Sequence, residues 1–499
     1  MPHDAQRPAL ALADGLSREF LLHHRLCPKD RREDGAIVVA VSADAARDAL
    51  DDIAFVYRAP VVTEEVKSEE VDRLIERLTT NSERSIELAR ASASDGGLVD
   101  DLTDSGTADV RDLANQPPVV RYVNLLVRDA YDAGASDIHL EAMRHGLSAR
   151  FRLDGVLTPA PEPPALLHQA VVSRVKLLAE LDIAERRRPQ DGRIRVRLEA
   201  RELDLRVSTV PTMYGESVVL RLLDRGGRPV ELDELGMNPE ILDRMQHLAA
   251  RPHGMLLVTG PTGSGKTTTL YACLAHRDAD AEKIVTVEDP VEYQLTGITQ
   301  VPVHRQAGVT FGTALRSILR QDPDVIMIGE MRDQETAEIA VQATMTGHLV
   351  FSTLHTNDAV GAIPRLLDLG IPEYLVAATV EAVVAQRLVR RNCDVCRESY
   401  TPNTQSLSLL AGRPVGRMKL QRGAGCVKCR GTGFRGRLGV FELMVMTDAL
   451  KDAIARRSPR STLRSLAQDS GMHTLRSEGW AKVEAGLTTV EEVLRVVQE

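Results

Sequence analysis

Apolar residues recur along the first 90 residues with the spacings of one short strand and several helices. The strand is the apolar run at residues 36–41 (AIVVAV). Helical patterns flank it at residues 17–26 and 43–50, and another helical face follows at residues 71–78, where apolar residues lie three and four positions apart. Residues 1–90 are therefore predicted to form a small α/β domain.

A polar stretch separates this domain from a second apolar pattern. Residues 91–117 are rich in Asp, Ser, Gly and Thr with little apolar periodicity, which predicts a flexible linker. Helical periodicity resumes at residues 119–132, and short strand-like runs follow at residues 138–140, 148–153, 194–198, 202–207 and 218–223. Residues 118–230 are therefore predicted to form a second small α/β domain, and a stretch near residues 225–235 with two Gly and a Pro is predicted to be a linker.

From residue 236 onward, buried strand-like runs alternate with helical patterns. The runs are residues 255–259, 283–287, 325–328 and 349–353, and they are spaced for helical crossovers. Near-continuous apolar strands joined by helices are typical of a parallel sheet that is covered on both faces. The sequence thus predicts an α/β protein whose largest domain is residues 236–499.

Composition and charge narrow the classes of function. Of the 499 residues, 43% are apolar and only 3% are aromatic, which is ample for packed cores but argues against a surface that stacks on bases. The net charge of −9 makes the chain a poor general binder of phosphate backbones, so no nucleic acid partner is expected. Residues 1–115 hold 14 basic and 24 acidic residues, whereas the remainder holds 48 and 47. The acidity therefore belongs to the first quarter of the chain.

Neither a secretory signal nor a membrane span is predicted. The N-terminal residues MPHDAQRPAL lack a basic region followed by an apolar one, and no run of about 18 apolar residues occurs. The six cysteines are too few for a disulfide scaffold in a chain of this length. These observations predict a cytoplasmic protein.

A glycine-rich loop at residues 260–267 (GPTGSGKT) fits the phosphate-loop pattern GxxxxGK[ST]. It follows a predicted buried strand and precedes a helical run at residues 268–275, which is the context that the pattern requires. Backbone N–H groups of such a loop converge on phosphate oxygens. Its members are Gly260, Pro261, Thr262, Gly263, Ser264, Gly265, Lys266 and Thr267. Lys266 is expected to reach the β- and γ-phosphates, and the Thr267 hydroxyl to bind Mg²⁺.

Acidic residues follow two of the predicted strands. Glu288 and Glu292 follow residues 283–287, and Glu330 follows the run that contains residues 325–328. Carboxylates at the carboxyl ends of parallel strands lie where ligands bind, and nucleotide hydrolysis needs one near Mg²⁺ and one near the attacking water.

Two histidines bracket another predicted strand. His348 and His355 stand at the two ends of the run TGHLVFSTLH, and each either senses the γ-phosphate or makes a structural hydrogen bond. The spacing alone leaves both roles open.

Four cysteines form two CxxC pairs late in the chain. Cys393 and Cys396 are separated by 29 residues from Cys426 and Cys429. Four thiolates suit a tetrahedral structural zinc site, although a redox CxxC or unliganded thiols are the alternatives. The remaining two, Cys27 and Cys273, are isolated and are expected to be core residues.

Several stretches together resemble the ATPases that drive type II secretion and type IV pilus assembly. Their Walker A motif, aspartate box, Walker B motif and histidine box are matched by residues 260–269 (GPTGSGKTTT), 287–293 (VEDPVEY), 319–333 (LRQDPDVIMIGEMRD) and 346–359 (TGHLVFSTLHTNDA). Their second N-terminal domain, which is PAS-like, is matched by residues 134–141 (GASDIHLE), 150–155 (RFRLDG) and 204–224 (DLRVSTVPTMYGESVVLRLLD). The resemblance runs from about residue 115 to the C-terminus.

The resemblance implies a RecA-like ATPase domain that works in a hexameric ring. It implies that Lys266 and Thr267 bind ATP and Mg²⁺, that Glu330 is the Walker B acid, and that Glu292 activates water, with Glu288 as the alternative. His348 and His355 become nucleotide-proximal residues. Arginines in the matched motifs are candidates to reach the γ-phosphate on domain closure, although a lone arginine can equally be a surface ion pair; they are Arg206, Arg221, Arg316, Arg320 and Arg332.

The resemblance also concerns partners. A tetracysteine zinc insertion at about residues 390–435 is typical of secretion and assembly ATPases, and the short domain at residues 1–90 resembles the part that docks on inner-membrane platform proteins. The implied function is a cytoplasmic hexameric ATPase, peripheral at the inner membrane, that powers pseudopilus assembly and protein export. A type IV pilus assembly ATPase is the closest alternative, followed by a non-hydrolysing scaffold and a DNA-transfer ATPase.

Overall fold

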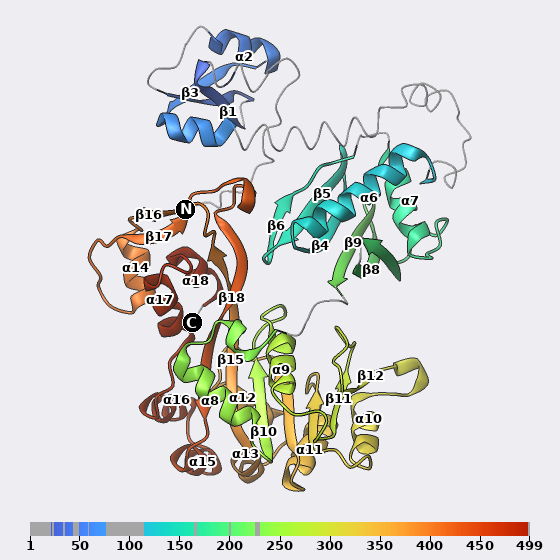
Figure 1. Ribbon diagram of the computed structural model, residues 1–499, viewed down its shortest axis with the longest axis vertical. Helices are drawn as coiled ribbons and strands as arrows, with labels where there is room; N and C mark the ends of the chain where they lie inside the picture. Colours follow the sequence, from blue (N-terminus) through green and yellow to red (C-terminus); the bar gives the residue numbers. More distant parts are fainter. Residues whose placement is uncertain are drawn as a thin grey trace. The chain divides into compact units, whose positions relative to one another are not determined.

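The computed structural model of the chain (Figure 1) describes residues 21, 24–32, 35–42, 49–57, 59–75, 114–163, 167–198, 201–224 and 230–497. It forms two compact units. One is Met1–Gly226 with Ala424–Gly433, and the other is Gly227–Gly423 with Phe434–Glu499. The predicted linker at residues 91–117 lies almost wholly outside the described residues. The finer domain boundaries drawn from the sequence stay predictions.

The N-terminal part contains a three-stranded sheet in the order β1-β2-β3. Its elements are β1 (Leu26–Arg31), β2 (Ile37–Val41), α2 (Ala49–Tyr57) and β3 (Val61–Glu65). The central strand β2 is buried along its whole length, which confirms the strand predicted there. Leu26 begins β1 instead of ending the helix predicted at residues 17–26, because its side chain is fully buried where β1 pairs with β2. Most of that helix and of the one predicted at residues 43–50 lies outside the described residues.

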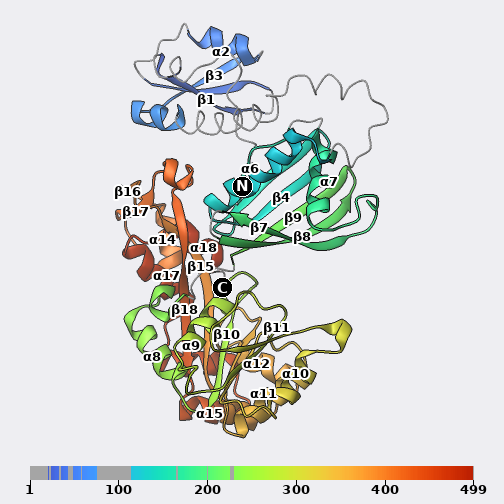
Figure 2. The same cartoon turned by 45° about the vertical axis from the view of Figure 1, so that its right-hand side comes forward.

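The second part of this unit is a six-stranded antiparallel sheet with two helices on one face (Figure 2). The order is β6-β5-β4-β9-β8-β7. The elements are α6 (Pro117–Asp132), β4 (Ala135–Met143), β5 (Gly146–Leu153), β6 (Val156–Pro159), α7 (His168–Leu178), β7 (Gln190–Leu198), β8 (Arg201–Thr212) and β9 (Gly215–Asp224). All the strands predicted here are present, most of them longer than predicted, whereas β6 and α7 were not predicted.

Helix α6 shows why its sequence forms a helix at this place. It begins with two prolines, whose missing N–H groups cost nothing in the first turn. Its apolar residues recur every three or four positions, and this face packs in the same core as Leu203, Leu205 and Val207 of β8. These three alternate along the strand, so the opposite face of the sheet carries the polar residues.

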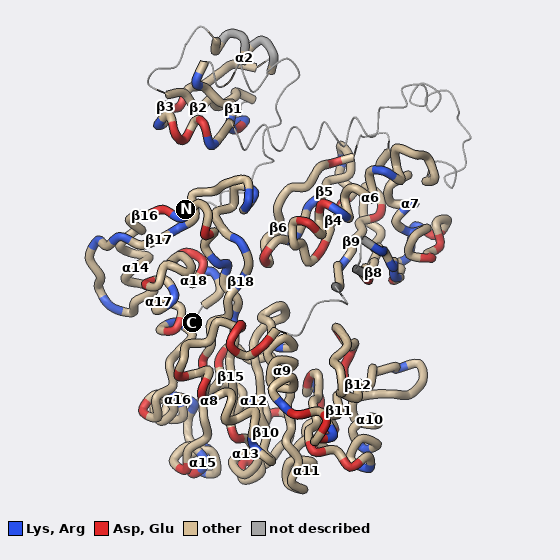
Figure 3. Tube along the Cα trace, viewed as in Figure 1, with Lys and Arg blue, Asp and Glu red and all other residues tan. Residues whose placement is uncertain are grey.

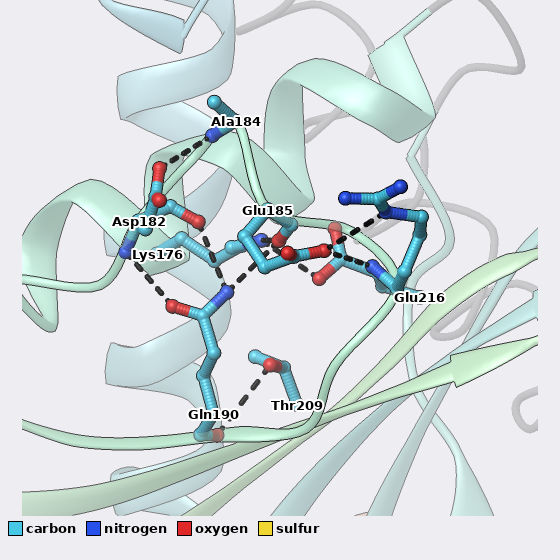
Figure 4. Close-up of polar contacts among 8 residues, drawn as sticks. Lys176, Asp182, Ala184, Glu185, Gln190, Thr209 and Glu216 are labelled. Atoms are coloured by element: carbon cyan, nitrogen blue, oxygen red, sulfur yellow. Dashed lines mark hydrogen bonds and ion pairs between the residues drawn. The ribbon is translucent and has the colours of Figure 1, made fainter.

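A buried lysine fixes the connection between α7 and β7 (Figure 4). The Lys176 side chain is fully buried, and its Nζ donates to Glu216 Oε1 and to the Glu185 carbonyl oxygen, both at 2.7 Å. The Gln190 side chain accepts from the Asp182 N–H at 2.9 Å and donates to the Asp182 and Glu185 carbonyl oxygens. A buried ammonium is costly unless it is paired, so these partners bind the connection firmly to the sheet.

This connection and the edge strand after it are strongly basic. Arg186, Arg187 and Arg188 are exposed on the connection, and every second residue of β7 from Arg193 to Arg197 is also an exposed arginine. Figure 3 colours Lys and Arg positions blue along the chain. β7 is at the edge of its sheet. Charged side chains along an edge strand disfavour pairing with another strand, so this edge of the sheet is suited to remain in contact with solvent.

The second unit contains a seven-stranded sheet in the order β12-β11-β13-β14-β10-β15-β18. All neighbouring strands are parallel except the pair β15 and β18. The strands are β10 (Gly254–Thr259), β11 (Ile284–Glu288), β12 (Thr299–Pro302), β13 (Val325–Ile328), β14 (Leu349–Leu354), β15 (Val380–Asn392) and β18 (Phe434–Val445). The predicted α/β fold with a parallel sheet is confirmed, as are its four predicted strands. β12, β15 and β18 were not predicted.

Helices cover both faces of this sheet (Figure 1). Alternate residues of β10 enter opposite cores: Met255 and Leu257 pack in one, and Leu256 and Val258 in the other. The covering helices include α8 (Pro239–Ala249), α9 (Lys266–Ala275), α10 (Phe311–Ile318), α11 (Gln334–Met345), α12 (Ala362–Asp368) and α13 (Glu373–Thr379). Burial on both faces explains why the strands read as continuous apolar runs.

The C-terminal part of this unit consists mainly of helices. They are α15 (Asp448–Ala455), α16 (Arg460–Asp469), α17 (Leu475–Glu484) and α18 (Val490–Val496), and three of them are capped by a threonine hydroxyl. Before β18 lies an insertion with β16 (Arg397–Tyr400), α14 (Thr404–Ala411) and β17 (Leu420–Gly423). No helix in the described part of the chain is long and apolar enough to cross a bilayer.

Candidate nucleotide site and cysteine cluster

The glycine-rich loop joins the end of β10 to the start of α9. Gly260, Gly263 and Gly265 all have positive φ, at 150°, 78° and 88°. A Cβ at Gly260 would lie 2.6 Å from the Gln386 carbonyl oxygen, and one at Gly265 would lie 2.8 Å from Gln386 Nε2. Both backbone conformation and space therefore require glycine. The loop leads into the N-terminus of α9, whose backbone N–H groups are suited to phosphate.

Lys266 is the first residue of α9 and turns back over the loop. Its Nζ donates to the carbonyl oxygens of Gly260 at 2.8 Å and Pro261 at 3.1 Å. Burial, together with a smaller effect of the charge of Arg387, lowers the pKa of Lys266 to about 8, although the charge of Glu330 acts in the opposite direction. The ammonium is thus held ready for an anion that would restore its pKa.

Glu330 and His355 come to this place from the two neighbouring strands. Glu330 follows β13, and His355 follows β14, so both lie at the carboxyl edge of the sheet. His355 Nε2 is 3.6 Å from Glu330 Oε2, and Arg332 Nε is 2.6 Å from the same oxygen. The pKa of His355 is lowered by burial and by the charge of Lys266, against the effect of Glu330. The structure therefore brings Lys266, Glu330 and His355 together.

Glu288 and Glu292 have different surroundings. Glu288 ends β11 and is buried; it accepts hydrogen bonds from the hydroxyls of Tyr271 and Thr286 and from Gln300 Nε2. Glu292 is half-buried, and its carboxylate accepts no hydrogen bond from the described part of the chain. Glu288 is thus committed to its neighbours, whereas Glu292 is available for other contacts.

His348 lies apart from the phosphate loop. It precedes β14, whereas His355 follows it, and the parallel register places the start of β14 beside the start of β10. His348 therefore lies about one strand length from the phosphate loop. For the six-residue strand β14 this is about 17 Å. His348 Nδ1 is hydrogen-bonded to Thr346 Oγ1 and to the Ala343 carbonyl oxygen, which is a structural role.

The candidate arginines divide between the two units. Arg206 on β8 and Arg221 on β9 are directly paired in register on the polar face of the six-stranded sheet, and Arg221 Nε donates to Asp137 Oδ1 at 2.9 Å. In the other unit, Arg316 forms an ion pair with Glu335 at 2.6 Å. Arg320 lies just beyond the end of α10 and donates to the Arg316 carbonyl oxygen of that helix.

Sequence reasoning missed two polar residues of β15 that border the phosphate loop. Gln386 accepts a hydrogen bond from Thr269 Oγ1 at 2.7 Å, and Arg387 Nη1 is 3.1 Å from where a Cβ on Gly260 would be. Both side chains are buried. The signal was present in the sequence as a Gln-Arg pair inside the apolar run EAVVAQRLV, because buried polar residues need a reason.

The four paired cysteines form one cluster. The sulfur atoms of Cys393, Cys396, Cys426 and Cys429 all lie within 4.8 Å of one another. The Cys426 N–H and the Gly433 N–H donate to Cys429 Sγ at 3.1 and 3.3 Å, which favours a thiolate. Four sulfur ligands of this kind fit a tetrahedral structural zinc ion. The isolated Cys27 and Cys273 are buried, as predicted, and burial raises the pKa of each thiol to about 12.

Comparisons with known proteins place this architecture in one family. Residues 112–495 match the family model described as Type II/IV secretion system protein, and residues 2–85 match the MshEN domain. Type II secretion system protein E of Xanthomonas campestris pv. campestris is 44% identical over 99% of this chain and 87% of that protein. The protein of the same name from Dickeya dadantii is 43% identical over 99% of this chain and 98% of its own length.

Solved structures give the same answer for the fold. The pilus retraction motor PilT with bound ADP superimposes with a TM-score of 0.53 at 26% identity, covering 75% of this chain and 96% of PilT. The Legionella pneumophila ATPase DotB superimposes with a TM-score of 0.56 at 19% identity, covering 75% and 95%.

A parallel sheet with a glycine-rich phosphate loop, an acidic residue and a histidine at its carboxyl edge is the site of a P-loop ATPase. The chain belongs to the type II/IV secretion ATPase family, in the group named type II secretion system protein E.

The lowered pKa of Lys266 predicts a pH-dependent affinity for nucleotide. The phosphates favour the ammonium, so binding raises this pKa; affinity is therefore full below pH 8 and falls as the pH rises above 8. We expect the dissociation constant of a non-hydrolysable ATP analogue to rise by up to about tenfold per pH unit above pH 8, measured by titration calorimetry. In the Lys266→Arg variant the charge persists over this range, so its dissociation constant should not change with pH. A wild-type dissociation constant that stays constant from pH 7 to 9.5 would contradict the assignment of Lys266 to the phosphates.

The cysteine cluster predicts one zinc ion per chain. Metal analysis of the purified protein should find about one equivalent of zinc, and Cys429→Ser should lose it because a hydroxyl is a poor zinc ligand. Cys273→Ser, at an isolated buried cysteine, is the matched control and should retain the metal. A wild-type protein without zinc, or with the cysteines oxidised, would refute the site.

Proposed function

We propose that the chain is the motor of a type II secretion system, which hydrolyses ATP with Mg²⁺ to power pseudopilus assembly and protein export. The observation that carries this proposal is the convergence of Lys266, Glu330 and His355 beside the glycine loop. A carboxylate and a cation at the phosphate end of a P-loop are what phosphoryl transfer to water requires.

The residues present fit ATP and Mg²⁺. The loop glycines leave their N–H groups free to approach phosphate, Lys266 supplies a charge, and Thr267 follows it at the position whose hydroxyl holds the metal in P-loop enzymes. Mg²⁺, when bound, would neutralise part of the negative charge on the phosphates. Glu330, whose carboxylate lies 3.6 Å from His355 Nε2, would help to hold the metal ion.

Glu292 is the better candidate for the group that activates water. A general base must have an acceptor oxygen available for the proton. The Glu288 carboxylate already accepts from three donors, whereas the Glu292 carboxylate is not held in this way. We therefore assign Glu288 to holding Tyr271 and Gln300 in place, and Glu292 to the water.

We infer that arginines help to neutralise the charge on the γ-phosphate during hydrolysis. Arg206 and Arg221 present two guanidinium groups from adjacent strands, and a pair of this kind suits a developing negative charge on the γ-phosphate. Arg320 donates to Arg316 and Ser317 of the adjacent helix α10, and both bonds are exposed, so it can turn towards nucleotide at little cost. Delivery of these arginines in a homohexamer would couple hydrolysis to domain movement.

The comparisons favour type II secretion over type IV pilus assembly. The relatives named type II secretion system protein E align along the acidic N-terminal part as well as the ATPase part, because they cover 99% of this chain. In the proposal, residues 1–90 dock on inner-membrane platform proteins, which would hold a cytoplasmic motor at the inner membrane.

The choice of base is tested by isosteric substitution. Glu292→Gln should lower kcat for ATP hydrolysis by about a hundredfold or more with KM little changed, because only the proton acceptor is lost. Glu288→Gln should mainly lower the thermal stability, since a neutral amide can keep only part of the hydrogen bonds that Glu288 accepts. Phosphate release measures the loss of kcat, and thermal unfolding measures the loss of stability. Equal loss of kcat in both variants at unchanged stability would refute the assignment.

The biological role is tested by complementation. In the source bacterium lacking its own gene, the wild-type gene should restore release of folded protein into the medium, and Lys266→Ala should not. Expression level and folding of the variant are the controls. Restoration of surface pili without restored release would show that the chain is a pilus assembly motor.

A further inference from the structure

The loop that follows β14 carries His355, and several successive residues after His355 are hydrogen-bonded to other parts of the domain. The Thr356 N–H donates to Thr259 Oγ1 at 2.8 Å, and Thr259 directly precedes the phosphate loop. One residue further on, the Asn357 carbonyl oxygen accepts from Arg387 Nη2 at 2.8 Å. The next residue, Asp358, is bonded to helix α16. The loop is thus tied to the phosphate loop, to β15 and to α16.

Asp358 makes the strongest of these attachments. Its Oδ1 accepts from the Gly361 N–H at 2.7 Å, and its Oδ2 accepts from the guanidinium groups of both Arg460 and Arg464 (Figure 3 marks the charged positions of α16). The Asp358 side chain is only 13% exposed. Charge-assisted hydrogen bonds are about twice as strong as neutral ones, so these bonds hold the loop firmly against α16.

Arg387 joins this attachment to the nucleotide site. Its guanidinium is buried, lies against Gly260 and lowers the pKa of Lys266 by its charge. On the other side it interacts with Asp358 and with the buried Glu442. Glu442 in turn accepts from the Ala359 N–H at 2.8 Å. A continuous set of buried or half-buried charges therefore leads from the phosphate loop to α16.

Buried charges are not needed if the only role of these residues is to stabilise the fold. Buried ion pairs are often no more stabilising than apolar residues of the same volume, and apolar residues fill the rest of this core. The hydrogen bonds of charged groups such as Arg387 and Asp358 depend on the charges around them. An anion bound at the neighbouring phosphate loop would therefore affect them. The arrangement is thus suited to positioning and to reporting nucleotide.

We propose that Arg387 and Asp358 are positioning residues of the nucleotide site, which fix the His355 loop against the phosphate loop and anchor it to α16 through Arg460 and Arg464. This inference rests on the proposed ATPase function. It assigns α16 a part in the hydrolysis step, through its bonds to Asp358.

The test is steady-state ATP hydrolysis by the full-length protein with Asp358→Asn. Asparagine retains an acceptor for the Gly361 N–H but loses the charge that holds two arginines. We expect kcat to fall by about tenfold or more and KM for ATP to stay within about threefold, because misplacement of a catalytic loop by an ångström can cost up to about a hundredfold. Arg464→Lys, which retains the charge, should recover most of the activity that Arg464→Gln loses.

The matched control is Asp452→Asn on α15, which removes an exposed acidic partner of Arg456 and should leave both constants unchanged. If Asp358→Asn and Arg464→Gln retain kcat within twofold, or lose activity only in proportion to the folded fraction seen by circular dichroism, the inference is overturned. A wild-type protein that hydrolyses no ATP would instead overturn the proposed function, and the inference with it.

Discussion

The parallel alignment of five neighbouring strands is the constraint on which the site depends. In β11, β13, β14, β10 and β15 the chain runs in one direction, so residues that follow different strands meet at one edge. The ends are also bonded to each other: the Gly329 N–H donates to the Val287 carbonyl oxygen, and Thr353 Oγ1 donates to the Gly329 carbonyl oxygen. Glu330 and His355 follow these bonded ends directly. A shift of one strand would separate them.

The chemistry of this edge arises from burial beside charge. Lys266, Glu330, His355 and Arg387 share a place where solvent is partly excluded, so each changes the electrostatic environment of the next. The glycine loop can lie this close to β15 because it has no side chains at the points of contact. A nucleotide that enters brings negative charge to a cluster with an excess of cations, and the attached loop and helix α16 experience that change.

Much of this was visible in the sequence, and the exceptions have physical causes. The phosphate loop, Glu330 and the four cysteines were predicted because each needs a particular residue type at a fixed spacing. Strand β15 was missed because Arg387 and Arg390 interrupt its apolar run, and their partners come from distant segments. His348 and His355 looked equivalent because they bracket one strand, but strand direction places only His355 at the nucleotide edge. Lys176 and Glu216 were missed because their pairing spans 40 residues.

Whether this chain is an ATPase that uses Lys266 is tested most directly by comparing phosphate release from Mg-ATP by the wild-type protein and by Lys266→Ala, each at saturating nucleotide and equal concentration. We expect the wild type to release phosphate and the variant to lose about a hundredfold or more of this rate, because the lysine charge would face the transferring phosphate. Equal rates for the two proteins would contradict this expectation.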